Sequence, residues 1–117
     1  MDTRTLNSPG LALACAQSEV PRDGTVVTCS VNGHSVAIAR RSINEEAIVA
    51  FDSKCPHMKG PLRFGRVVEG EVICPWHFLR FDTTTGDAAC CDKSNMKLKI
   101  YPVQIMDGNV YVHTTAE

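Results

Sequence analysis

The sequence predicts an all-β domain, an antiparallel β-sandwich or barrel, and three of its features favour that class. β-branched residues gather in short runs, as in residues 25–31, rather than at helical spacing. Two-residue turn signals such as Asn32-Gly33 separate successive runs. Residues 97–100 alternate polar and apolar side chains, as a half-buried strand does. Only residues 44–47 compete for helix, and they allow at most one turn.

The expected strands follow one another along the chain with short turns between them. They cover residues 25–31, 35–40, 47–51, 66–68, 71–73, 78–82, 97–103 and 110–112. Turns are predicted at Asn32-Gly33, Glu69-Gly70, 85–87 and Asp107-Gly108, each of which contains a glycine. Residues 1–9 are polar and have no period, so we expect a disordered N-terminus followed by a single domain over residues 10–117.

Composition and charge exclude several classes of partner. The chain has 117 residues and a net charge of −1, which argues against nucleic acid or an anionic membrane as a partner. Its longest apolar run, residues 11–16, is too short for a membrane span, which needs about 20 residues. The same run is too short for the core of a signal peptide. We therefore expect a cytoplasmic protein.

Two short boxes supply two cysteines and two histidines. Residues 55–57 read Cys-Pro-His, sixteen residues follow, and residues 74–77 read Cys-Pro-Trp-His. Thiolates and imidazoles are ligands for zinc, copper or iron–sulfur centres rather than for magnesium or calcium. Zinc sites usually pair two cysteines in one run and two histidines in another, whereas here each box supplies one of each. This alternation favours a [2Fe–2S] centre with two thiolates on one iron and two imidazoles on the other.

The boxes and the residues around them resemble the Rieske iron–sulfur family over roughly residues 11–113. Supporting stretches are Gly-Pro-Leu at residues 60–62, Phe-Asp-x-x-Thr-Gly at residues 81–86 and Tyr-Pro-Val at residues 101–103. The resemblance implies one Rieske-type [2Fe–2S] cluster and a Rieske-type β-sandwich or barrel with two cluster-binding loops. The implied ligands are Cys55 and Cys74 on one iron, and His57 and His77 on the other.

Within that family the chain is similar to the soluble ferredoxins of ring-hydroxylating oxygenases. The resemblance implies an electron carrier, not an enzyme, which takes single electrons from an NAD(P)H-dependent reductase and passes them to a terminal oxygenase. High-potential relatives have a disulfide between the loops where this chain has Gly60 and Trp76, and hydroxyl donors where it has Leu79 to Phe81. Fewer hydrogen bonds to sulfur imply a low potential. The alternatives are a small subunit of a reductase complex, such as nitrite reductase, and a structural zinc domain.

The remaining cysteines and histidines have simpler interpretations. Cys15 and Cys29 lie in apolar or β-branched runs and are expected to be buried thiols. Cys90-Cys91 should place one side chain inward and one outward, with a redox-active or metal-binding pair as the alternative. His34 and His113 are expected to be exposed strand residues rather than ligands.

Several residues around the boxes have expected roles that do not involve ligation. Lys54, Lys59, Arg63 and Arg80 form either a docking surface or a merely solvated rim. Met58, Pro61, Leu62 and Trp76 are expected to shield the metal site from water, and Gly60 and Gly65 to permit tight turns.

Overall fold

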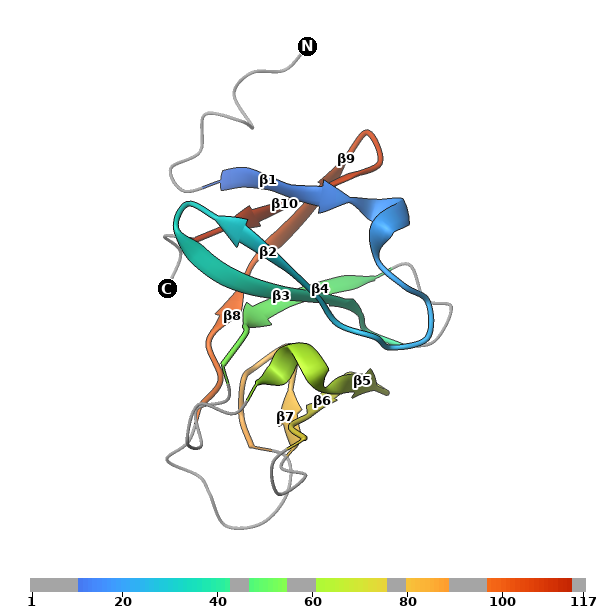
Figure 1. Cartoon of the computed structure of the whole chain (residues 1–117), viewed down its shortest axis with the longest axis vertical. Coiled ribbons are helices and arrows are strands. Elements are labelled where there is room, and N and C mark those ends of the chain that lie inside the picture. The colour runs from blue at the N-terminus through green and yellow to red at the C-terminus, as the bar shows by residue number, and fades with distance from the viewer. Residues whose placement is uncertain (1–10, 43–46, 55–60, 76–79, 89–96, 115–117) are drawn as a thin grey trace.

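The described part of the chain forms three antiparallel sheets. The computed structural model describes residues 11–42, 47–54, 61–75, 80–88 and 97–114. In these ranges the regular elements are ten strands and two three-residue 3-10 turns, which confirms the predicted all-β class. The first sheet has the order β1-β10-β9, the second β2-β3-β4-β8 and the third β5-β6-β7 (Figure 1).

The elements have the following bounds. The first sheet contains β1 (Leu11–Ala16), β10 (Asn109–His113) and β9 (Val103–Met106). The second contains β2 (Val27–Val31), β3 (His34–Arg40), β4 (Ile48–Asp52) and β8 (Ile100–Tyr101). The third contains β5 (Arg66–Val68), β6 (Glu71–Ile73) and β7 (Arg80–Asp82). The turns are η1 (Gln17–Glu19), after β1, and η2 (Leu62–Phe64), before β5.

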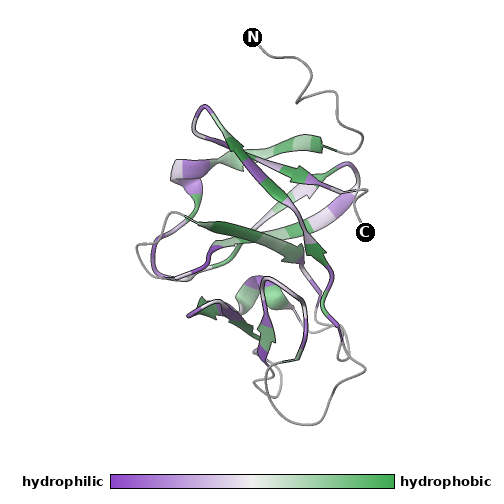
Figure 2. Ribbon diagram, turned by 180° about the vertical axis from the view of Figure 1, so that it is seen from behind, coloured by the Kyte–Doolittle hydropathy of each residue, from purple (hydrophilic) through white to green (hydrophobic). Residues whose placement is uncertain are grey.

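The second sheet lies in the middle of the molecule, and apolar side chains cover both of its faces. Successive residues of β3 point to opposite faces, so Ala37 and Ala39 enter one apolar cluster while Val36 and Ile38 enter another. The first cluster reaches the third sheet, and the second reaches the first sheet. Figure 2 shows most of the apolar colour on the strands. Burial on both faces therefore fixes the second sheet between the other two.

The hairpin turns agree with the sequence analysis. Asn32, Glu69 and Asp107 have φ angles of 51°, 51° and 52°, and the glycine that follows each has a φ of 81°, 82° and 76°. Positive φ at both central residues gives a turn whose twist matches that of the flanking strands. The predicted hairpins β2–β3, β5–β6 and β9–β10 are thereby confirmed.

Two predictions about strands were incomplete. Residues 97–103 were expected to form one strand, but the chain changes sheets at Pro102, which lacks the N–H needed to continue a ladder. β8 pairs with β4 before this proline, and β9 pairs with β10 after it. β1 was not predicted, because its Leu-Ala-Leu-Ala-Cys-Ala sequence lacks β-branched residues and its pairing with β10 is a long-range contact. Three of the four residues in the predicted turn at 44–47 lie outside the described residues.

No helix in the described ranges is long and apolar enough to span a membrane.

Arg40, at the end of β3, is a buried cation that joins the second sheet to the segment after β1. Its side chain is 2% exposed. Nε donates a hydrogen bond to the Val20 carbonyl at 3.1 Å, and Nη2 donates to the Gln17 carbonyl at 3.1 Å. The bond to Val20 is buried and the bond to Gln17 is part-buried, so the guanidinium fixes η1 and the residue that follows it against the sheet.

We predict that Arg40→Leu lowers the free energy of unfolding by about 1–3 kcal/mol, because the buried Val20 carbonyl loses the guanidinium donor, whereas the Gln17 carbonyl keeps the Val20 N–H. Urea denaturation followed by circular dichroism measures this change. Arg63→Leu is the matched control, since Arg63 is exposed and its replacement should cost less than about 0.5 kcal/mol. Equal effects of the two substitutions would contradict this role for Arg40.

Candidate metal centre

The second box begins at the end of β6. Ile73 of β6 pairs with Arg80 of β7, so the segment between them is the connection of a hairpin. Cys74, the first residue of that connection, is fully buried and forms no disulfide. It shares an apolar cluster with Leu62 and Phe81. The hairpin thus places one predicted ligand thiol in a site shielded from water. His77 lies outside the described residues.

The first box lies between two described segments whose ends are held together. Lys54 and Pro61, which flank residues 55–60, form an antiparallel bridge. The Leu62 N–H donates to the Ser53 carbonyl at 3.0 Å, and the Ser53 hydroxyl donates to the Ser35 hydroxyl of β3 at 2.8 Å. Cys55 and His57 themselves lie outside the described residues. The base of this loop is therefore fixed to the second sheet.

Gly65 brings the bases of the two loops into contact. A Cβ atom at this position would lie 2.3 Å from the Ile73 carbonyl oxygen and 3.2 Å from that of Leu62. The tight turn predicted here is present, because η2 ends at Gly65, whose N–H donates to the Leu62 carbonyl at 2.9 Å. The φ of −83° is open to any residue, so the turn itself does not require glycine. Close backbone approach requires the glycine instead. Ile73 directly precedes Cys74, so this contact positions the second loop against the end of the first.

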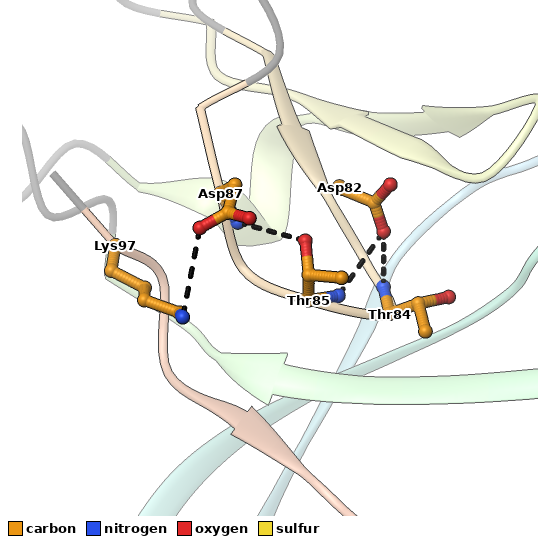
Figure 3. Close-up of polar contacts among 5 residues, drawn as sticks. All are labelled: Asp82, Thr84, Thr85, Asp87 and Lys97. Atoms are coloured by element: carbon orange, nitrogen blue, oxygen red, sulfur yellow. Dashed lines mark hydrogen bonds and ion pairs between the residues drawn. The ribbon is translucent and has the colours of Figure 1, made fainter. Parts of the chain in front are cut away.

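The Phe-Asp-x-x-Thr-Gly stretch forms a closed turn after β7. The Asp82 carboxylate accepts hydrogen bonds from the Thr84 and Thr85 N–H groups at 2.7 and 3.1 Å (Figure 3). Asp87 forms an ion pair with Lys97 at 3.6 Å. Gly86 has a φ of 85°, and a Cβ there would lie 2.2 Å from the Leu98 carbonyl oxygen. This turn holds β7, the strand that follows the second loop, against residues 97–98. Those residues adjoin the second sheet.

The donor set fits an iron–sulfur centre. Cys74 supplies a protected thiol that no disulfide occupies, and the loops that carry all four predicted ligands have bases in contact. Two cysteines and two histidines are the donors of a [2Fe–2S] centre with mixed ligands. Among the described residues, no three histidine, cysteine or acidic side chains gather to form a metal site.

An apolar and basic surface, here called the Phe64 ledge, lies beside the second loop. Phe64 is 67% exposed, and the Arg63 guanidinium lies 4.7 Å from the centre of its ring. Phe64, Ile73 and Pro75 contribute to the lining of a pocket of about 310 Å³. Arg63 was predicted as part of a basic docking surface or solvated rim, but Phe64 was not predicted to lie at this surface. A single apolar residue between an arginine and a glycine gives no periodic signal.

The other basic residues of the predicted rim differ in their ion pairing. Lys54 is exposed, and Arg80 forms an ion pair with Glu71 at 3.7 Å, so part of its charge is already compensated. Lys59 lies outside the described residues.

Other predicted residues have varied positions. Leu62, expected to shield the site, is fully buried in the apolar cluster that contains Cys74, and Pro61 is half-buried. His34 is exposed as predicted, whereas His113 is half-buried in β10. Cys15 and Cys29 are half-buried rather than buried. Six other residues with predicted roles lie outside the described residues: Met58, Gly60, Trp76, Leu79, Cys90 and Cys91.

Comparisons with known proteins agree on one family. Residues 11–102 match the model of the Rieske [2Fe-2S] domain. The ferredoxin component of the p-cumate 2,3-dioxygenase system of Pseudomonas putida is 32% identical over 113 residues, which cover 96% of this chain and 92% of that protein. The ferredoxin of Sphingomonas yanoikuyae B1 has a similar structure, with a TM-score of 0.76 and 26% identity over 88% of this chain and 97% of its own.

A second solved structure has the same fold. It is the complex of reduced oxygenase and oxidised ferredoxin in carbazole 1,9a-dioxygenase, in which the matched chain has a TM-score of 0.78 and 22% identity. The match covers 94% of this chain and 98% of that one.

We predict that Gly65→Ala lowers both stability and iron content. The added methyl group must displace the Ile73 carbonyl and with it Cys74, at a cost of about 2 kcal/mol or more. Gly108→Ala is the control, because its Cβ meets nothing within 4 Å. It should cost about 1 kcal/mol for its positive φ and leave the iron content per folded chain unchanged. Equal iron content in both variants would show that the Gly65 contact does not position the ligands.

Proposed function

Because this chain belongs to the Rieske [2Fe–2S] family, we propose that it is a ferredoxin that delivers single electrons to an aromatic-ring-hydroxylating oxygenase. The observation that carries the proposal is the buried, disulfide-free Cys74 at the end of β6, beside the base of the first loop. The p-cumate 2,3-dioxygenase ferredoxin, similar over nearly its whole length, supports the oxygenase as acceptor. An NAD(P)H-dependent reductase is the donor that we propose.

We assign the four ligands to two sides of the centre. Cys55 and Cys74 are the proposed thiolate ligands of one iron, and His57 and His77 the imidazole ligands of the other. One-electron uptake and release is the chemistry that the bound [2Fe–2S] cluster supplies. Two thiolates, rather than four, leave the site less negative, so the ligand set makes it easier to accept an electron. Burial of Cys74 excludes water from its thiolate and keeps the local dielectric low.

The Phe64 ledge is the surface that we propose for partner docking. Phe64 offers exposed apolar area close to the second loop, and Arg63 adds a positive charge beside it. A partner surface with an apolar centre and nearby carboxylates would complement both features. A carrier must also dissociate after each transfer, and a small patch with charge attraction favours fast association without long residence.

The same features bear on the location and on the alternative function. We propose a cytoplasmic location, since the reductase draws on NAD(P)H. We also propose one domain over residues 10–117.

The alternative function, a subunit fixed in a reductase complex, needs a large apolar interface. Among the described residues, the exposed large apolar side chains are dispersed: Leu13 and Ile105 belong to the first sheet, and Phe64 and Val68 lie in or near the third. This distribution favours the carrier.

The purified protein should be coloured and contain about two irons and two acid-labile sulfides per chain. His57→Ala or His77→Ala should remove or convert the cluster, because each imidazole is a ligand. His34→Ala is the control, since His34 is exposed on β3 and should leave the visible spectrum unchanged. Iron and sulfide analysis with absorption spectroscopy gives the answer. A colourless protein that binds one zinc would contradict the ligand assignment.

Electron delivery is tested by reconstitution with the reductase and oxygenase encoded by neighbouring genes. Product formation from NAD(P)H should require this chain. Phe64→Ser should lower the second-order rate of reduction of the oxygenase by roughly tenfold, as loss of an interface anchor does. Arg63→Glu should lower the rate most at low salt, where the attraction is least screened.

The control for these variants is Leu13→Ser, which removes an exposed apolar side chain from β1, at the opposite end of the molecule from the third sheet (Figure 1). It should retain the wild-type rate. Wild-type rates for Phe64→Ser and Arg63→Glu at all salt concentrations would mean that the ledge is only a solvated surface. Product formation without this chain would overturn the carrier function itself.

A further inference from the structure

Cys15 and Cys29 form a pair of thiols that links two sheets. Cys15 belongs to β1 in the first sheet, and Cys29 belongs to β2 in the second. A side-chain hydrogen bond joins them, and neither forms a disulfide. In Figure 1, β1 lies at the opposite end of the molecule from β5–β7, and β2 lies between them in the second sheet. Both cysteines pack against the apolar cluster shared by the first and second sheets, not against the one that contains Cys74. The pair is therefore separate from the candidate metal centre.

A β-bulge turns Cys15 toward its partner. The register of β1 against β10 shifts between Leu13 and Cys15. Strict alternation would place Cys15 on the same face as Leu13, which is 55% exposed. Cys15 instead packs against the apolar cluster that also contacts Cys29. A bulge commonly re-aims a side chain in this way, so the local backbone brings the two sulfur atoms together.

The surroundings keep both thiols protonated at neutral pH. Burial, together with the neighbouring Cys29, raises the pKa of Cys15 to about 12. Burial also raises the pKa of Cys29, and the carboxylate of Glu19 in η1 adds to the effect at both sulfurs. The cross-strand neighbours are apolar: Val110 of β10 lies opposite Cys15, and Val36 of β3 lies opposite Cys29. The dithiol is thus a stable form that reacts slowly.

We propose that Cys15 and Cys29 are a second redox site, a dithiol–disulfide couple that joins the first sheet to the second. With a small-molecule disulfide such as glutathione disulfide as oxidant, one sulfur attacks and releases one glutathione thiol. The other sulfur then displaces the second glutathione thiol. One S–S bond forms in the protein, one breaks in the oxidant, and both cysteine protons end on the two glutathione molecules. Two electrons leave the protein, whereas the metal centre exchanges one.

The bridge would restrain the start of the domain. It would connect β1, whose ladder partner is β10, to β2 across the boundary between two sheets. Closing the short loop between residues 15 and 29 restricts the unfolded chain. The thermal midpoint of the oxidised protein should therefore rise by about 10 °C. The visible spectrum of the iron–sulfur cluster should stay unchanged, because the pair contacts a different apolar cluster from the one that contains Cys74.

Peptide mapping of the cluster-loaded protein tests the proposal. The protein is incubated with excess glutathione disulfide, its remaining thiols are alkylated, and it is digested with trypsin. Cleavage after Arg4, Arg22 and Arg40 places Cys15 in peptide 5–22 and Cys29 in peptide 23–40. We expect one linked species, lighter by two hydrogen atoms than the sum of the two reduced peptides. Its rate of formation should rise about tenfold per pH unit between pH 7 and 9, in proportion to the thiolate fraction.

Variants separate this pair from the other cysteines. Cys29→Ser should abolish the linked species and the rise in thermal midpoint, while a Cys90→Ser/Cys91→Ser variant should retain both. The proposal is overturned if the wild-type peptides are recovered only separately or only as glutathione adducts at pH 9. It is also overturned if linkage occurs only in protein that has lost its visible absorption.

Discussion

Four side chains from two loops can bind one cluster only if the loops are held at a fixed separation, and the backbone contact at Gly65 provides that constraint. The Ile73 carbonyl lies so close to Gly65 that no side chain fits there. Because Ile73 directly precedes Cys74, this contact also fixes the position of the buried thiol. The Lys54–Pro61 bridge closes the base of the first loop, and the turn at Asp82 fixes the exit from the second. Backbone contacts among the described residues thereby hold the bases of both loops in place.

The division of the fold into layers separates the candidate metal centre from the first sheet. The second sheet is covered on both faces, with Val36 and Ile38 toward the first sheet and Ala37 and Ala39 toward the third. The small side chains of Ala37 and Ala39 face the apolar cluster that contains Cys74, so the third sheet packs closely against β3. Exposed residues near the site, chiefly Phe64 and Arg63, are then free to contact partners without taking part in the core.

Local signals in the sequence predicted much of this fold. Hairpin turns such as Asn32-Gly33 were recognisable because they need positive φ at two successive residues. Residue type, spacing and the family resemblance together predicted four ligands, of which only Cys74 lies in the described residues. β1 and the change of sheets at Pro102 could not be predicted from the local sequence, because both depend on long-range strand pairing. The close approach at Gly65, across the β5–β6 hairpin, and the meeting of Cys15 with Cys29, across two sheets, depend on three-dimensional packing that no sequence pattern signals.

The proposed ligand set divides two histidines and two cysteines between the two irons of one cluster. Pulsed electron paramagnetic resonance of the reduced protein, prepared with ¹⁵N-labelled histidine, distinguishes this set from four sulfur ligands. Two histidine nitrogens should be coupled to the unpaired electron, and both couplings should change on labelling. Loss of one coupling in His57→Cys and of the other in His77→Cys would identify them. A spectrum without any histidine coupling would mean four sulfur ligands and would overturn the proposed ligand set.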